Sequence, residues 1–396
     1  MAAKRGAANG VSADRVRAFW ADRQGMGRGM KGLAPEVVLA RTGWSRSVGG
    51  CNPYLALRDR AGVSRAATDA AVGEVAICEL PAVRGCTYVV PKSDFAVALT
   101  ASQGKGEDPE ITTAKKYLGV TDTELERLSR KVLDAVAREA LDPAGLKEAL
   151  GGAVRSLGEE GKKRGVATTL PLVLGLLQAQ GQLRRVAIEG RLDRQRYRYA
   201  RWEPNPIGTA RFAPGELAQE LGRRFFRWAG PATVGQFAWW SGLGVKAARA
   251  AAQEIGVVPL GAAEEIDKAD ERLLFPDDRD ALLALELPRA PSIAFVSALD
   301  NLVHLRREVL AHLHADDAAI RAPGPEQKGE KTSAASVGAL VDLEYHPIVD
   351  RGRIVGLWDW DGERGELVWR TFGTAPKGAR EEAAALSVYV AAELED

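Results

Sequence analysis

Cysteine and histidine are scarce in this chain of 396 residues, which holds three of the former and four of the latter. Cys51, Cys78 and Cys86 lack the spacing of metal ligands, and the histidines have no cysteine or carboxylate partner at such spacing. No signal peptide and no apolar run of membrane-spanning length is apparent. These absences predict a reduced cytoplasmic protein, nucleoid-associated in a bacterium, with no metal, no cofactor and no membrane partner.

Charge is segregated along the chain, although the formal net charge is only +1. Residues 1–60 hold eleven lysines and arginines against four acids, and residues 182–202 hold seven arginines against two acids. Residues 261–300 have the opposite balance, with ten acids and four bases. Basic blocks offset by an acidic one are typical of a protein that lays selected faces on phosphate. We therefore expect a partner that carries phosphates, which the helix-turn-helix patterns below specify as double-stranded DNA, and we further expect the protein to be a monomer.

Polar and proline-rich stretches divide the chain into four blocks. SQGKGEDPEI (102–111) and EPNPIG (203–208) are typical of a loop and a linker, and RAPGPEQKGEKTSAAS (321–336) of a flexible insertion. With 46% hydrophobic residues the chain is able to build more than one core. The predicted domains are 1–110, 111–203, 208–290 and 291–396.

The second block has the pattern of helices followed by a basic hairpin. Thr121 begins a capping-box pattern, and the apolar spacing that follows, as far as Ala140, indicates a helix of about five turns. Two shorter helices are expected at 141–152 and 168–181. The alternating sequence of 182–202 then indicates a β-hairpin rich in arginine.

The third block repeats this order. Helical patterns cover 215–230, 233–242 and 245–256, and the glycines of Gly242-Leu243-Gly244 make the tight break between the last two. Strand-like VVPLG and RLLFP follow, on either side of an acidic loop. The second helix of this helix-turn-helix pattern carries Lys246, Arg249 and Gln253 on one face.

Three helices and a two-stranded hairpin make a winged helix. The predicted fold class is therefore α+β, mainly helical, with tandem winged-helix (helix-turn-helix) domains and a C-terminal β-rich module. In that module Asp350-Arg351-Gly352-Arg353 has the pattern of a hairpin turn, with Trp358 and Trp360 on one core-facing side. A winged helix contacts DNA or serves as a scaffold for protein contacts, and the acidic wing of the third block favours the scaffold there.

Arginine dominates the residues that we predict to contact DNA. Arg194, Arg196 and Arg198 would share one strand face, with Tyr197 and Tyr199 on the other, although a solvated arginine face over buried tyrosines has the same pattern. The predicted DNA contacts are Arg41, Arg46, Arg84, Thr87, Tyr88, Arg184, Arg185, Arg194, Arg196, Arg198, Lys246 and Arg249.

Several segments, in order, resemble a known family. They are RTGWSRSVGGCNPYLALRDRAG (41–62), ELPAVRGCTYVVP (79–91), GPAT and WWSGL in the third block, ALDNLVHLRREVL (298–310) and HPIVDRGRIVGLWDWD (346–361). Together they are similar to the winged-helix DNA-binding family that includes the AlkZ and YcaQ DNA glycosylases. The resemblance implies tandem winged helices around a duplex, a C-terminal β-rich module, and excision of alkylated bases or unhooking of interstrand crosslinks.

The resemblance also implies a catalytic Gln-x-Gln or Gln-x-Asp motif upstream of the segment YLALRDR, and this chain has no such motif at that place. Ser45 and Ser47 stand at the two motif positions. Hydrolysis of a glycosidic bond needs a group that positions or deprotonates water, and within the predicted active-site segment 41–90 an amide or carboxylate would have to supply it. The candidates are Asn52 and Glu79, which equally fit a turn residue before Pro53 and an exposed strand residue.

Two functions therefore stay open. The resemblance favours a DNA glycosylase that excises N7-alkylated bases or unhooks interstrand crosslinks. The missing glutamines favour a non-enzymatic winged-helix protein that binds DNA, such as a regulator. An amide or carboxylate in a basic setting within residues 41–90 would favour the enzyme.

Overall fold

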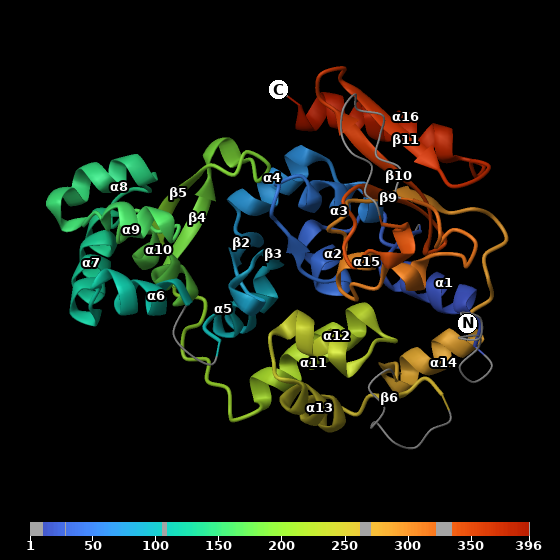
Figure 1. Ribbon diagram of the computed structural model, residues 1–396, viewed down its shortest axis with the longest axis horizontal. Helices are drawn as coiled ribbons and strands as arrows, with labels where there is room; N and C mark the ends of the chain where they lie inside the picture. Colours follow the sequence, from blue (N-terminus) through green and yellow to red (C-terminus); the bar gives the residue numbers. More distant parts are fainter. Residues whose placement is uncertain (1–10, 28, 105–108, 262–270, 322–334, 396) are drawn as a thin grey trace. The chain divides into compact units, whose positions relative to one another are not determined.

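The computed structural model describes residues 11–27, 29–104, 109–261, 271–321 and 335–395 (Figure 1). The chain forms two compact units. Unit 1 comprises residues 1–46, 51–68 and 218–396, and unit 2 comprises residues 47–50 and 69–217. The four sequence blocks remain a prediction, because these units gather segments that are distant in sequence. Within the described residues no helix is both long and apolar enough to cross a membrane.

Unit 2 contains six helices and two strand pairs within its described residues. Its elements are β2 (Ile77–Pro81), β3 (Thr87–Pro91), α5 (Phe95–Ser102), α6 (Pro109–Leu118), α7 (Asp122–Ala135), α8 (Pro143–Leu150), α9 (Gly158–Lys163), α10 (Leu170–Ala179), β4 (Leu183–Ala187) and β5 (Tyr197–Arg201).

Helices α7, α8 and α10 of unit 2 begin within two residues of where the sequence predicts and share one core. The Thr121 hydroxyl accepts a hydrogen bond from the Glu124 amide and so caps α7, while Asp142 caps α8. Helix α7 is shorter than expected, since it ends at Ala135. The apolar faces of α7, α8 and α10 bury Leu128, Val132 and other side chains in a continuous cluster. Helices α6 and α9 were not anticipated.

The basic hairpin is present, but its second strand begins later than the alternation suggests. Strands β4 and β5 pair antiparallel, with Ala187 opposite Tyr197. Arg194 lies in a turn and Arg196 precedes the strand. The prediction that Arg194, Arg196 and Arg198 share one strand face is therefore wrong. The connection turns tightly instead, because Glu189 and Gln195 have left-handed φ values of 62° and 52°.

Unit 1 contains the remaining elements. They are α1 (Ala13–Arg23), α2 (Pro35–Thr42), β1 (Ser45–Arg46), α3 (Asn52–Ala61), α4 (Arg65–Gly73, which continues into unit 2), α11 (Glu216–Ala229), α12 (Val234–Ser241), α13 (Val245–Glu254), β6 (Val258–Pro259), β7 (Leu273–Leu274), α14 (Pro276–Ala284), β8 (Ile293–Phe295), α15 (Asn301–His304), β9 (His346–Asp350), β10 (Arg353–Asp361), β11 (Glu366–Thr371) and α16 (Ala379–Tyr389).

The helix-turn-helix predicted in the third block is confirmed. Thr233 and Gln236 form a reciprocal capping box at the start of α12, and Gly242, with a left-handed φ of 74°, ends that helix. Strands β6 and β7 pair after α13, and the acidic loop between them lies outside the described residues. Trp240 on α12 is buried against Trp44 and Trp228, with ring centroids 5.6 and 5.7 Å away.

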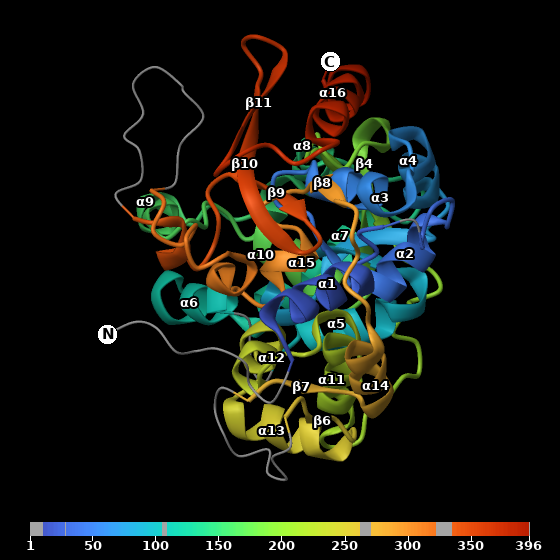
Figure 2. The same cartoon turned by 90° about the vertical axis from the view of Figure 1, so that its right-hand side faces the viewer.

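The C-terminal β-rich module is a four-stranded antiparallel sheet in the order β11-β10-β9-β8. Arg351 and Gly352 form the predicted turn with φ values of 49° and 82°. Trp358 and Trp360 pack in one cluster with Leu386 of α16, which lies beside the sheet (Figure 2). The predicted insertion at 321–336 lies almost entirely outside the described residues.

We predict that a fragment of residues 69–217 folds by itself, because its helices enclose their own core. Urea unfolding followed by far-UV circular dichroism should give one cooperative transition. Val132→Ala, which truncates a fully buried side chain, should lower the free energy of unfolding by about 1–2 kcal/mol. A fragment without a cooperative transition would contradict the prediction.

Candidate active site and nucleic-acid interface

The four predicted catalytic residues form two hydrogen-bonded pairs. In unit 1, Asn52 is the first residue of α3, and its Nδ2 donates to Ser45 Oγ at 3.0 Å and to the Arg46 carbonyl oxygen at 2.8 Å. Asn52 is 2% exposed, and its amide oxygen has no hydrogen-bond partner. The amide therefore organises residues 45–52 and keeps one unused acceptor.

The second pair lies in unit 2 and joins Ser47 to Glu79. Ser47 Oγ donates to Glu79 Oε1 at 2.9 Å, and both residues are buried. Glu79 is the central residue of β2 and is 4% exposed, so it is not the exposed strand residue of the alternative interpretation. Its other oxygen, Oε2, is buried without a hydrogen bond within normal distance. Such an oxygen is able to accept from a water or a reacting group.

The neighbours of Glu79 offset only part of the cost of burying its negative charge. Burial raises the pKa of Glu79 above its ordinary value, and Arg185, Tyr197 and Ser47 oppose that rise by favouring the charged form. The Arg185 guanidinium lies 3.4 Å from Glu79 Oε1 and also donates to Gln178. A buried carboxyl with a raised pKa is suited to accepting a proton near neutral pH.

A glutamine approaches Ser47 from the β4–β5 connection. Gln195 Nε2 lies 3.2 Å from the Ser47 carbonyl oxygen and 2.9 Å from the Tyr197 hydroxyl. Gly50 permits this approach, because a Cβ there would lie 2.3 Å from the Cα of Asp193. The segment 47–50, β2 and the hairpin of unit 2 thus bring a hydroxyl, a carboxylate, a phenol and an amide together.

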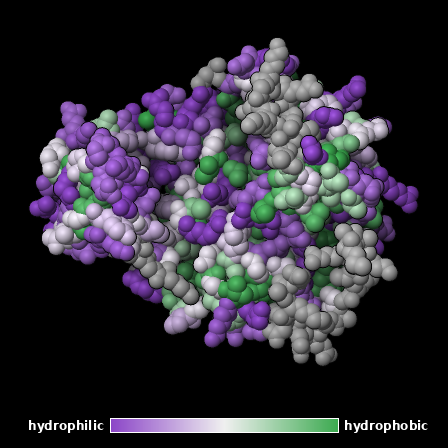
Figure 3. Space-filling view, in the orientation of Figure 1, coloured by the Kyte–Doolittle hydropathy of each residue, from purple (hydrophilic) through white to green (hydrophobic). Residues whose placement is uncertain are grey.

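The exposed basic residues of unit 2 lie partly on this same hairpin. Arg196 and Arg198 are exposed, and Figure 3 shows hydrophilic residues over the β4–β5 hairpin. Arg84 is exposed at the tight turn between β2 and β3, while Thr87 and Arg184 are half-buried. These positions suit contact with phosphate.

Other predicted DNA contacts are directed into the protein. Tyr88 is 1% exposed, so its ring belongs to the core, and Arg185 is engaged with Glu79 and Gln178. Arg46 and Arg194 are half-buried and have partners within the protein. The expectation that Tyr88 and Arg185 face DNA is therefore not supported by where they lie.

The remaining predicted contacts belong to unit 1. Arg41 is exposed in the last turn of α2, and Lys246 is exposed on α13. Arg249 is half-buried on the same helix, while Ala248, Ala251 and Ala252 pack its opposite face into the core. Helix α13 therefore presents the polar face that the sequence predicts.

Metal ligands do not cluster in the described part of the chain, where no group of three or more histidine, cysteine or acidic side chains is placed to hold an ion. His312 is buried, and burial lowers its pKa to about 3. Its Nδ1 lies 2.9 Å from the Gly352 carbonyl oxygen, a contact that fixes the start of β10.

Sequence reasoning missed Gln195 and Gln178 and treated Tyr197 only as core. Gln195 is separated from Ser47 by 148 positions, and no local pattern joins them. The one available signal was a glutamine inside the arginine-rich run DRQRYRY. A polar residue within a predicted hairpin connection is a candidate for a functional site, because such connections carry side chains away from the core.

One comparison with known proteins identifies a family. Residues 50–395 match the family described as DNA glycosylase AlkZ-like. The solved structure of Streptomyces sahachiroi DNA glycosylase AlkZ is similar, with a TM-score of 0.67 and 19% sequence identity over 96% of each chain. At that identity the likeness establishes the fold. No curated protein gives a significant match to this chain.

We predict that Glu79→Gln stabilises the protein at neutral pH by about 1 kcal/mol, since it removes an incompletely compensated buried charge. Glu79 has a folded pKa above its unfolded value, so the wild type loses stability as pH rises from the unfolded through the folded pKa. The advantage of glutamine should therefore vanish in acid. Urea unfolding at several pH values measures it, and a purely structural carboxylate would instead make Glu79→Gln destabilising at pH 7.

Proposed function

This chain belongs to the AlkZ-like DNA glycosylase family, and from that premise we propose that it excises N7-alkylated purines from double-stranded DNA with Glu79 in place of the missing glutamines. The observation that carries the proposal is the buried Glu79 carboxylate: its pKa is raised although Arg185 and the Tyr197 and Ser47 hydroxyls favour the charged form, and its Oε2 forms no hydrogen bond of normal geometry with a described residue. The same site is proposed to act on interstrand crosslinks that are attached through N7-alkylated purines.

The leaving group needs little help from the protein. A purine alkylated at N7 carries a positive charge, so cleavage of its glycosidic bond releases a neutral base. The remaining sugar has oxocarbenium character, and a water must attack it and lose a proton. A carboxylate beside that water stabilises the sugar cation and accepts the proton.

Each side chain around Glu79 has a definable part in this proposal. Ser47 Oγ holds Oε1 by a 2.9 Å hydrogen bond and so directs Oε2 toward the water. The Arg185 guanidinium favours the ionised carboxylate that the reaction requires. Gln195 supplies an amide oxygen, which forms no hydrogen bond in the described structure, as a second acceptor for the water. Ser47 itself is too weakly basic to activate water.

Asn52 has a supporting part. Its Nδ2 is occupied by Ser45 Oγ and the Arg46 carbonyl oxygen, so the amide is fixed in one orientation. We propose that Asn52 holds the segment that contains Ser45 and Arg46 in place. Ser45 in turn holds the Asn52 side chain. Removal of Asn52 should therefore change the rate less than removal of Glu79.

Duplex binding is assigned to exposed arginines and lysines. Arg196 and Arg198 are exposed on the hairpin of unit 2, and Arg84 is exposed beside β3. Arg41 and Lys246 supply further cations from unit 1. These side chains bind phosphate without reading bases, so little sequence preference is expected.

Glu79→Gln should slow excision of N7-methylguanine at least about a hundredfold in single turnover, because the amide holds water but accepts no proton. Ser47→Ala should cost about tenfold or less, since it loosens the carboxylate without removing it. DNA affinity, measured by fluorescence anisotropy, should stay within about twofold of the wild type for both.

Glu74→Gln is the matched control, because Glu74 is an exposed acid of the same unit. It should excise at the wild-type rate. Equal rates for Glu79→Gln and Glu74→Gln would remove Glu79 from the mechanism. A wild type that binds the duplex and releases no N7-alkylated base or crosslink would replace the glycosylase with a non-enzymatic DNA-binding protein.

The double substitution Arg196→Ala and Arg198→Ala should weaken duplex binding and reduce the slope of log K against log salt by about 1–2, because two phosphate contacts are lost. Arg127→Ala with Arg130→Ala is the control, since both arginines are exposed on α7 of the same unit. An unchanged slope in the hairpin variant, or an equal change in the control, would place the binding face elsewhere.

A further inference from the structure

Val48 is an exposed apolar side chain beside the proposed catalytic carboxylate. It follows Ser47 directly, and Ser47 Oγ donates to Glu79 Oε1 at 2.9 Å. Val48 is 54% exposed, whereas Ser47 and Glu79 are buried. The β4–β5 connection that contacts Ser47 exposes polar side chains, those of Gln195 and Arg196. Val48 therefore brings apolar surface to a polar part of unit 2.

The turn that carries Val48 is fixed in position. The Gly50 amide donates to the Ser47 carbonyl oxygen at 2.9 Å, and Gly49 has a left-handed φ of 80°. These features make a type II turn with Val48 at its second position. Gly50 lies so close to Asp193 that a Cβ there would be 2.3 Å from the Asp193 Cα. The turn is therefore braced against the hairpin of unit 2, and Val48 is held in one place.

The stability of the turn does not account for a valine at this position. The second position of a type II turn favours proline, whereas valine favours strands. Since Val48 is more than half exposed, its burial contributes little to the free energy of folding. A contact with a bound molecule would make use of this apolar surface.

Tyr117 is the other exposed large hydrophobic side chain in the part of unit 2 that the structure describes, at 50%. Its ring carries cations, because Lys116 Nζ lies 5.0 Å and the Arg164 guanidinium 4.3 Å from the ring centroid. Contacts within the protein therefore account for the position of this ring. Of the two side chains, Val48 is the one next in sequence to the Ser47–Glu79 pair.

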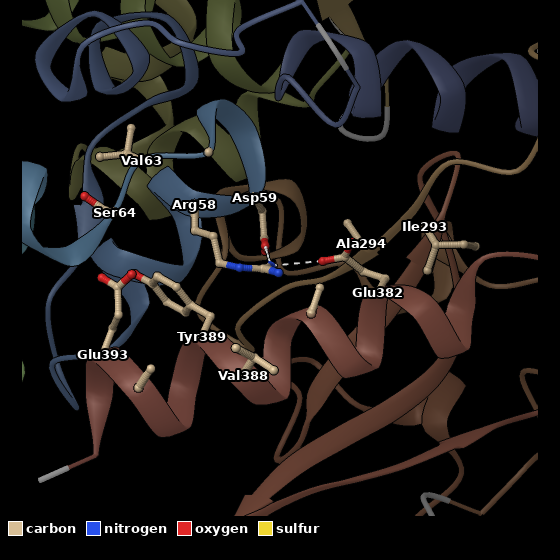
Figure 4. Close-up of a pocket in the computed structure, with 13 residues that line it drawn as sticks. Arg58, Asp59, Val63, Ser64, Ile293, Ala294, Glu382, Val388, Tyr389 and Glu393 are labelled. Carbon is tan, nitrogen blue, oxygen red and sulfur yellow. Dashed lines mark hydrogen bonds and ion pairs between the residues drawn. The ribbon is translucent and has the colours of Figure 1, made fainter.

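Val388 of unit 1 is still more exposed, at 69%, but it lies in an acidic setting. It lines a cavity of about 500 Å³ between α3, β8 and α16 (Figure 4). The same wall carries Asp59, Glu382 and Glu393. Arg58 donates to the first two of these acids at 2.7 and 3.0 Å. Three carboxylates and one arginine repel phosphate, so this cavity does not suit DNA.

The proposed reaction requires the duplex to open at the lesion. Glu79 is 4% exposed, and a buried carboxylate reaches the glycosidic bond of a stacked purine only when that purine leaves the stack. Unstacking costs a few kcal/mol, roughly, and an apolar side chain that enters the gap restores part of the lost contact. Val48 has the apolar character and the exposure for that part.

We propose that Val48 enters the base stack beside the alkylated purine and holds open the step from which the purine turns toward Glu79. The inference rests on the proposed excision at Glu79, and it adds the side chain that opens the duplex. Val48 bonds to no reacting atom, so it is a positioning residue that acts through the DNA. Its effect should therefore depend on how firmly the lesion is stacked.

The fluorescence of 2-aminopurine tests this role without any excision. The probe lies next to a tetrahydrofuran abasic analogue in a duplex, which has no base to release at that position. Saturating wild type should raise the fluorescence at least about threefold, because Val48 unstacks the probe. Val48→Ser should lose most of that rise, and Val48→Leu should keep it. Tyr117→Ser, the matched exposed position in unit 2, should behave as the wild type does.

Single-turnover release of N7-methylguanine supplies the second measurement. Val48→Ser should slow release from a fully paired duplex at least about tenfold, and release from an unpaired bubble less than about threefold, because the bubble is already unstacked. A valine that served only the structure of the turn would slow both substrates equally.

Three results would overturn the proposal. They are a wild type that saturates the duplex without raising the fluorescence, an equal rise for the wild type and Val48→Ser, and equal slowing on the paired and unpaired substrates. The first uses only the wild-type protein, so it decides the question even where a variant fails to fold. A rise that depends on Val48 in a protein that releases no base would support the wedge and overturn only the proposed excision.

Discussion

The buried ion pair between Arg60 and Asp300 is the interaction on which unit 1 depends. Its side chains are 1% and 0% exposed, and two guanidinium nitrogens donate to the two carboxylate oxygens at 2.7 and 2.8 Å. Asp300 also caps α15 by accepting from the Leu302 amide. Such a pair recovers its desolvation cost only when nearly all of its polar atoms are satisfied, so the elements that carry it are fixed in position.

Gln24 extends that constraint to the helices around it. Its amide oxygen accepts a hydrogen bond from Arg60, and its amide nitrogen, Nε2, donates to the carbonyl oxygens of Thr42 and Trp228. Helices α1, α2, α3 and α11 are thereby tied to one polar network. The first turn of α3 holds Asn52 and its last turn holds Arg58 and Asp59, so the network positions both.

Some buried side-chain oxygens form no hydrogen bond with any residue that the structure describes. Asn52, Glu79 and Asp59 each have one such atom. Each of these oxygens lowers the stability of the fold, because it lost its hydrogen bonds to water on burial and gained none in return. Stability alone would therefore favour apolar residues at these positions. In unit 2 the other oxygen of Glu79, Oε1, accepts from Ser47 Oγ and lies 3.4 Å from the Arg185 guanidinium. We interpret Glu79 Oε2 as the oxygen that contacts the attacking water.

The sequence alone predicted most of the local helices and the hairpin. It did not predict which side chains distant in sequence contact one another. Capping residues, helical spacing and the glycine pair predicted α7, α12, α13 and the hairpin of β4 and β5, because those features act within a few residues. The partnership of Ser47 with Glu79 spans 32 positions and that of Arg60 with Asp300 spans 240, and no periodicity encodes either. Burial excludes the alternative of an exposed strand residue at Glu79, since β2 is covered on both sides.

The central claim is that Glu79 accepts the proton of the attacking water, and the pH profile of single-turnover excision of N7-methylguanine tests it most directly. Because burial raises the pKa of Glu79, the wild-type rate should fall with decreasing pH at a pH above the ordinary glutamate range, and the residual rate of Glu79→Gln should lack that fall. A wild-type rate independent of pH, or the same acid limb in both proteins, would contradict the claim.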